Sequence, residues 1–107
     1  MIIVNMTPHS IQVVDEQGQL VKTYPASGQQ IRLKMETVSA GSLPDRTPLS
    51  KTVYGEPEGL PNAFEGTYYI VSQLVKNALP EREDLLVPAE IVRNPEGMII
   101  GCRSLGL

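Results

Sequence analysis

Two segments of the chain carry side chains that could bind an anion or move a proton. The first is Thr7-Pro8-His9-Ser10, whose start is held extended by the proline after Thr7. His9 is the only histidine, and a functional interpretation makes Thr7 and His9 hydrogen-bond donors to a ligand. The alternative is a structural turn at a strand edge, in which Thr7 and Ser10 satisfy local backbone groups.

The second segment runs from Gly66 to Pro88, where a strand leads into a short helix and an arginine follows among acids. Ser72 suits the helix N-cap because its oxygen can accept a free backbone N–H, and a helix start also favours an anion. Arg82, beside Glu83 and Asp84, has the fork geometry that binds phosphate or carboxylate. The alternative for Arg82 is a surface ion pair worth under ~1 kcal/mol.

Further candidates lie outside these two segments. Arg103 follows the apolar run Met98–Cys102 and is placed to point into a cavity. Tyr54 and Tyr68 can stack on a base or ring, with packing at the edge of the core as the alternative. The residues selected as ligand-binding are Thr7, His9, Tyr54, Tyr68, Ser72, Arg82 and Arg103.

Catalytic, metal and cofactor signatures are weak or missing. A Ser72–His9–Asp84 triad can be written, but no G-x-S-x-G elbow surrounds Ser72. One histidine, one cysteine and no close-spaced carboxylate set form no metal-ligand pattern, and no glycine-rich segment matches a phosphate or dinucleotide loop. We therefore expect no catalytic residues, no metal and no cofactor, with a small hydrolase using His9 as an alternative.

Composition limits the class of protein further. A chain of 107 residues has room for one core, so we expect a single domain over residues 1–107. A net charge of −3 gives no field for non-specific nucleic-acid binding. The single Cys102 cannot form an internal disulfide, and no apolar stretch approaches the ~20 residues of a membrane span. We expect a cytoplasmic protein without membrane contact.

The elements that would position these residues are mostly strands. Hairpins are predicted around the turns at 15–18 and 94–97, a strand with one buried face over 31–36, a buried strand at 68–71, and a helix at about 73–79. Within 39–66 only Leu49–Tyr54 resembles a strand, and the remainder reads as ordered loop anchored by Leu43, Leu60 and Phe64. The expected fold is α+β: six to eight mainly antiparallel strands in a small curved sheet or open barrel, with one short helix.

Several motifs together resemble a family of small, uncharacterised proteins of bacteriophages and prophages. The motifs are Asn5–Ile11, Tyr54-Gly55, Gly59-Leu60-Pro61, Gly66–Ser72, Ala78–Leu85 and Gly101-Cys102-Arg103. The resemblance covers nearly the whole chain and implies a setting rather than a mechanism. Small accessory proteins of this kind bind a host protein, a virion component or a nucleotide signal used in host defence.

We therefore expect a non-enzymatic module that captures a small anionic ligand, such as a nucleotide-derived signal of anti-phage defence. Capture requires burial of the ligand, so a homo-oligomer with sites between subunits is expected. The alternative from a different class is a protein-interaction or virion accessory protein, in which an exposed strand edge adds to a partner's sheet.

Overall fold

The computed structural model describes residues 1–107 and contains eight strands and one helix. In chain order they are β1 (Ile2–Asn5), β2 (Ile11–Val14), β3 (Leu20–Tyr24), β4 (Met35–Ser42), β5 (Pro48–Tyr54), β6 (Thr67–Ile70), α1 (Gln73–Ala78), β7 (Leu85–Arg93) and β8 (Ile99–Gly106). Six strands form one sheet in the order β1-β6-β7-β8-β2-β3, and β4 and β5 form a separate two-stranded sheet.

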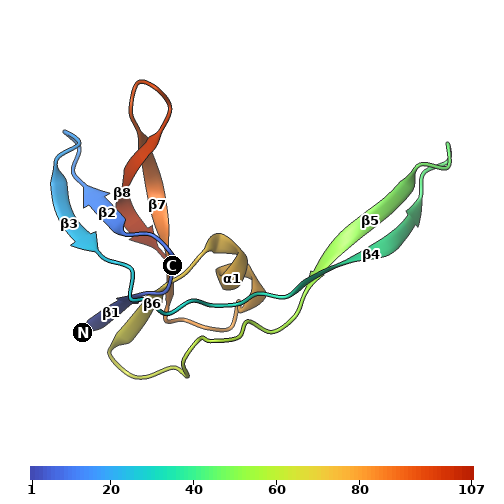
Figure 1. The fold of residues 1–107 in the computed structure, drawn as a ribbon, viewed down its shortest axis with the longest axis horizontal. Helices are drawn as coiled ribbons and strands as arrows, with labels where there is room; N and C mark the ends of the chain where they lie inside the picture. The colour runs from blue at the N-terminus through green and yellow to red at the C-terminus, as the bar shows by residue number, and fades with distance from the viewer.

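The six-stranded sheet is open, with β1 and β3 at its edges. Hairpins β2–β3 and β7–β8 are antiparallel, whereas β6 pairs in parallel with β1 and β7. Strands β2 and β8 are joined through one residue pair only, Val13 with Cys102, and the two hairpins diverge beyond it (Figure 1). Most paired residues are in antiparallel register, which confirms the predicted α+β fold with an open sheet and one short helix.

Both hairpin turns of this sheet form where they were predicted. Asp15 Oδ1 accepts two backbone N–H groups across the first turn, each at 2.9 Å, and Asn94 Oδ1 accepts one across the second at 2.9 Å. Gly18 and Gly97 take φ values of +79° and +83°, a region that side chains with a Cβ rarely adopt. The turns are therefore determined by local sequence.

The helix also begins where it was predicted. The backbone N–H of Val75 donates to Ser72 Oγ at 3.3 Å, which makes Ser72 the N-cap. The helix ends at Ala78, one residue before the predicted boundary. No helix in the structure has the length and apolar character that a membrane span requires.

The hydrophobic core lies between α1 and strands β6 and β7, and it is small. Only 11 of the 107 residues are buried, so apolar packing alone gives this chain little stability. The central cluster consists of Met6, Tyr69, Val71, Val75, Leu85 and Val87. Strand β6 is covered on both faces, as its continuous apolar sequence predicted.

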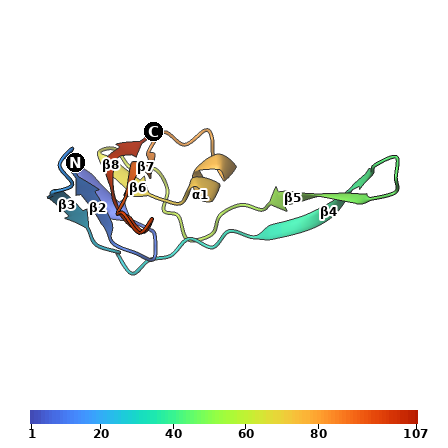
Figure 2. The same ribbon diagram turned by 90° about the horizontal axis from the view of Figure 1, so that it is seen from above.

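The hairpin β4–β5 projects from the rest of the molecule, and we call residues 35–54 the arm and the remaining residues the body. Figures 1 and 2 show the arm extending away from the body without returning to it. The molecule measures 52 × 39 × 22 Å, and its radius of gyration of 17.2 Å exceeds the ~13 Å of a compact chain of this length. None of the arm residues is buried.

One prediction about this region is wrong and a second is right in part. Residues 31–36 form no continuous strand: Arg32 makes an isolated bridge to Glu58, and β4 starts only at Met35, which is 60% exposed. Ile31 packs against the core cluster, so the buried face is lost where the chain leaves the body. Within 39–66 the predicted strand Leu49–Tyr54 forms as part of β5, but β4 continues to Ser42 and pairs with it, so residues 39–42 are strand rather than loop.

The apolar side chains expected to anchor that segment behave differently from one another. Leu60 packs against the core cluster, as predicted. Leu43 and Phe64 are 46% and 74% exposed. Of the three expected anchors, only Leu60 therefore holds this segment against the core.

Candidate functional site

The turn that carries Thr7 and His9 is organised by Asn5, a buried residue that sequence reasoning did not select. Asn5 is 2% exposed. Its Nδ2 donates to the carbonyl oxygens of His9 and Tyr24, each at 2.8 Å, and its Oδ1 accepts from the backbone N–H of Thr7 at 2.9 Å. Asn5 therefore joins the end of β1 to the end of β3. The sequence did contain a signal for this role, because an asparagine side chain two residues before Thr7-Pro8 can accept a hydrogen bond from the backbone and form a turn.

The Thr7 hydroxyl is used inside this turn. Thr7 Oγ1 lies 2.6 Å from Asn5 Oδ1 and 2.9 Å from the His9 carbonyl oxygen, and its single proton serves these acceptors. The ring of His9 is exposed, and none of the hydrogen bonds of the structure involves it. The geometry supports the structural interpretation of this turn.

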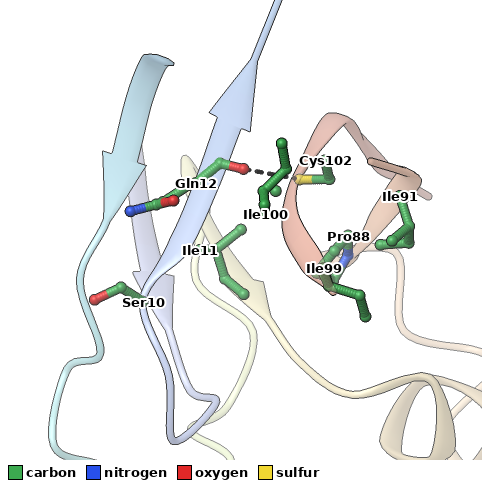
Figure 3. A pocket seen from close by; sticks show the side chains of 9 residues that line it. Ser10, Ile11, Gln12, Pro88, Ile91, Ile99, Ile100 and Cys102 are labelled. Carbon is green, nitrogen blue, oxygen red and sulfur yellow. Dashed lines mark hydrogen bonds between the residues drawn. The ribbon is translucent and has the colours of Figure 1, made fainter. Parts of the chain in front are cut away.

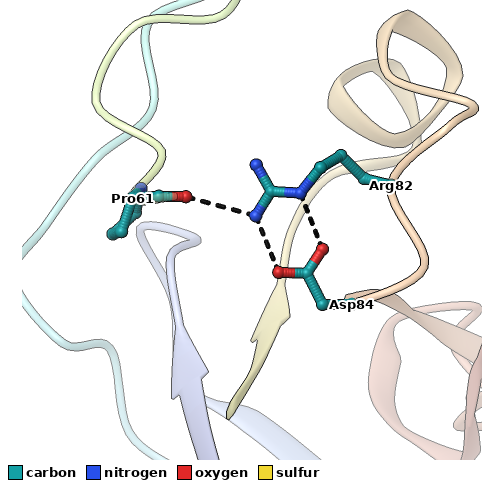
Figure 4. Close-up of polar contacts among 3 residues, drawn as sticks. All are labelled: Pro61, Arg82 and Asp84. Carbon is teal, nitrogen blue, oxygen red and sulfur yellow. Dashed lines mark hydrogen bonds and ion pairs between the residues drawn. The ribbon is translucent and has the colours of Figure 1, made fainter. Parts of the chain in front are cut away.

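Arg82 is held by the chain itself. Its Nε and Nη2 donate to the two carboxylate oxygens of Asp84 at 2.8 and 2.7 Å, and Nη2 also donates to the Pro61 carbonyl oxygen at 3.2 Å (Figure 4). The two side chains are only 20% and 14% exposed. The hydrogen bond from Arg82 lowers the pKa of Asp84, and the same bond raises the pKa of Arg82. The pair ties the loop at Pro61 to the segment after α1, so it is neither a free fork nor an exposed ion pair.

The hydrolase alternative has no assembled triad. Ser72 Oγ accepts from Val75 as the helix cap, and the carboxylate of Asp84 is taken by Arg82. No hydrogen bond joins Ser72, His9 and Asp84. No group of three or more His, Cys, Asp or Glu side chains lies close enough together to hold a metal ion.

A cleft of about 820 Å³ opens between α1 and the segment that follows it. It brings together two of the selected residues, Tyr68 and Arg82, with Lys76, which sequence reasoning placed only on the polar face of the helix. Lys76 Nζ donates to the Leu85 carbonyl oxygen at 3.1 Å, and Glu83 also lines the cleft. Lys76 and Arg82 thus already have hydrogen-bond partners within the chain, and the carboxylate of Glu83 adds a negative charge to the same cleft.

The other selected residues lie elsewhere. Tyr54 is on the arm opposite Met35 and is 44% exposed. Arg103 is exposed on β8 and lines a depression of about 330 Å³ with Arg93 and Glu90. The seven residues therefore do not converge on one site. Comparison with protein-family models, curated proteins and solved structures gives no match to this chain. The function of the chain must therefore be inferred from the geometry of the structure.

An apolar groove, which sequence reasoning missed, separates the β2–β3 hairpin from the β7–β8 hairpin (Figure 3). Its volume is about 300 Å³, and we call it the groove. It is lined by Ser10, Ile11, Gln12, Pro88, Ile91, Ile99, Ile100, Gly101 and Cys102. The consecutive apolar residues Met98-Ile99-Ile100 at a hairpin tip were the available signal, because such a run cannot alternate with polar residues on a half-buried strand.

The floor of the groove is formed where β8 touches β2. Cys102 is 1% exposed, its Sγ donates to the Gln12 carbonyl oxygen at 3.5 Å, and burial raises the pKa of its thiol. A Cβ on Gly101 would lie 2.8 Å from the same oxygen, so only glycine allows this approach. Ile99 and Ile100 remain 59% and 39% exposed above the contact.

Proposed function

We propose that this protein is a non-enzymatic interaction module that binds another protein through its arm. The observation that carries the proposal is the arm itself, two paired strands over residues 35–54 in which no residue is buried. A two-stranded hairpin with no covering layer is marginally stable at best in water. A hairpin of this length gains its stability when a partner covers one face or extends one edge.

The two faces of the arm differ in chemistry. Residues opposite one another in an antiparallel pair share a face, and successive residues alternate between faces. One face carries Val38, Leu49 and Val53, which we call the apolar stripe, together with the charged side chains of Glu36 and Lys51. The other carries the small polar residues Thr37, Ser39, Ser50 and Thr52, with Met35 and Tyr54 at the base of the arm. Both outer edges of β4 and β5 are unpaired, which also allows addition of a strand.

This proposal fits the setting that the resemblance to phage and prophage proteins implies. A small accessory protein in that setting acts by docking on another protein chain, which is a protein of the host or virion or a second copy of itself. The arm supplies the docking element, and the body holds the two strands together at their base through paired Arg32 and Glu58, with both N–H···O bonds at 2.7 Å.

The test is site-specific photo-cross-linking in cells that contain the natural partners. A photoreactive amino acid at position 49 places the probe on the apolar stripe, and the same amino acid at Ser50 places it on the opposite face. We expect a discrete cross-linked protein, identified by mass spectrometry, from position 49 alone. Binding of that purified protein should be lost in Leu49→Glu and kept in Ser50→Glu. Equal or absent cross-linking at the two positions would refute the role of the arm.

A second candidate function is capture of a small anionic ligand, such as a nucleotide-derived defence signal, in the cleft beside α1. The observation that favours it is the presence of Tyr68, Lys76 and Arg82 around a space of about 820 Å³, which is within the usual size of small-molecule sites. Calorimetric titration with cyclic nucleotides and ADP-ribose tests it, with Lys76→Ala expected to weaken binding and Lys22→Ala, far along the chain on β3, as control. No binding at micromolar concentration would reject this function.

A further inference from the structure

We infer that the partner of the arm is a second copy of this chain, and that the apolar stripe of one arm lies in the groove of the other copy. This inference rests on the arm being an interaction element, as proposed above. It adds the identity of the partner, the surface that receives the arm, and a reciprocal arrangement in which each chain gives one arm and accepts another.

The exposed area of the chain matches two interface halves. The accessible surface is 7723 Å², whereas a compact chain of 11.7 kDa exposes roughly 5,900 Å². The surplus is about 1,800 Å² by the same scaling. A standard interface removes about 800 Å² from each partner. The surplus is thus sufficient for two interface surfaces on each chain, namely the arm and the groove that receives the arm of the other copy.

The groove is the acceptor that the body offers. Ile91, Ile99 and Ile100 line it and are 46%, 59% and 39% exposed, although isoleucine is among the most often buried residue types. Large apolar patches are rare on soluble monomers and mark interaction sites. The stripe on the arm is the matching apolar element, with Leu49 and Val53 both 39% exposed.

Reciprocal exchange is compatible with the base of the arm. Gly55 N donates to the Lys34 carbonyl oxygen at 2.9 Å directly below the arm, so the two strands leave the body side by side and cross to a neighbour as one unit. Two copies related by a two-fold axis form two identical arm–groove contacts, the commonest closed arrangement of homo-oligomers.

The test measures mass in solution by sedimentation or light scattering. We expect the unmodified protein to be a dimer at micromolar concentration. Leu49→Glu on the arm and Ile100→Glu in the groove should each halve the mass, because each introduces a charge into the buried contact at a residue that is 39% exposed in the single chain. The matched controls Ser50→Glu, on the opposite face of the arm, and Val21→Glu, on the outer strand β3, should stay dimeric. Far-UV circular dichroism of each variant confirms that the body is folded.

Mixing the two monomeric variants identifies the arrangement. The groove of Leu49→Glu and the arm of Ile100→Glu are both intact, so an equal mixture should form a heterodimer through one contact while each variant alone stays monomeric. Dimers of Ile100→Glu alone would overturn the assignment of the groove, and a monomeric unmodified protein would overturn self-association. In that last case, a cross-link from position 49 to a different protein would still support the proposed function, so the two failures are distinguishable.

Discussion

The strongest consequence for stability concerns Asn5, because one buried side chain holds three segments together. Replacement of Asn5 by Ala removes its hydrogen bonds to the carbonyl oxygens of His9 and Tyr24 and removes the acceptor of the Thr7 backbone N–H, while the His9 oxygen keeps the Thr7 hydroxyl as a donor. Each buried polar group left unpaired costs about 1–3 kcal/mol. His9 is exposed and Thr7 is half-buried, so water can reach part of this turn, and we expect a total loss of about 2–4 kcal/mol in the free energy of unfolding.

The measurement is urea unfolding followed by far-UV circular dichroism at neutral pH, repeated at several protein concentrations so that self-association is separated from folding. The control is Thr7→Val, which removes one hydroxyl while keeping the shape of the side chain, and which should cost about 1 kcal/mol. Asn5→Asp should cost at least as much as Asn5→Ala, since an ionised carboxylate has no proton for the two carbonyl oxygens. A loss in Asn5→Ala no greater than in Thr7→Val would refute the role assigned to Asn5.

Three further outcomes can be checked with urea unfolding, in one case combined with thiol labelling. Arg82 lowers the pKa of Asp84 below the ordinary 3.8, so the pair stabilises the fold above that pH and the stabilisation is lost as pH falls through the lower folded value. The free energy of unfolding of Asp84→Asn should therefore be about 1–3 kcal/mol lower than that of the unmodified protein at pH 7, and the difference should shrink in acid. A difference that does not change with pH would contradict this. The thiol of Cys102 should react with a disulfide reagent only when urea unfolds the chain, and rapid labelling of the native protein would disprove its burial. Ser72→Ala should cost about 1 kcal/mol through loss of the helix cap, and Ser72→Thr much less.

The parts of the fold that were predicted correctly depend on neighbours in the sequence. The helix follows from Ser72 as a cap, an apolar face repeating every three or four residues, and Pro80 as a stop. The hairpin turns follow from Asp15 and Asn94, each with a glycine three residues later. Such signals act over one turn of chain, so they are readable without knowledge of the tertiary structure.

The hairpin of the arm was not predicted, although Leu49–Tyr54 was expected to be a strand, because the turn-forming residues of the arm have positional roles that sequence alone does not show. Gly41 lies where the register of β4 and β5 shifts between Ser39 and Ser42, with φ +94°, as expected of a β-bulge. Pro48 is the first residue of β5, where a missing N–H is tolerated. Both residues shape a hairpin here, whereas the same residues break a strand in its interior.

The candidate site could not be predicted because the role of each polar side chain depends on groups distant in the sequence. Arg82 has the geometry to bind a free anion until Asp84 and the carbonyl oxygen of Pro61 occupy it. Arg103 and Tyr54 lie on strands of different sheets, one in the body and one on the arm. Spacing along the chain contains no information about either fact.

The distribution of polar and apolar side chains argues for a partner more strongly than any single residue does. The core is small, and the hydrogen bonds of Asn5 and Arg82 hold loops to strands. The polar side chains best suited to bind a ligand are therefore already engaged within the chain. Leu49, Ile99 and Ile100, which have the character of core residues, lie on the surface. A surface of a partner that covers these apolar groups would complete the packing that the core lacks. The arm and the groove are where we propose that this surface binds.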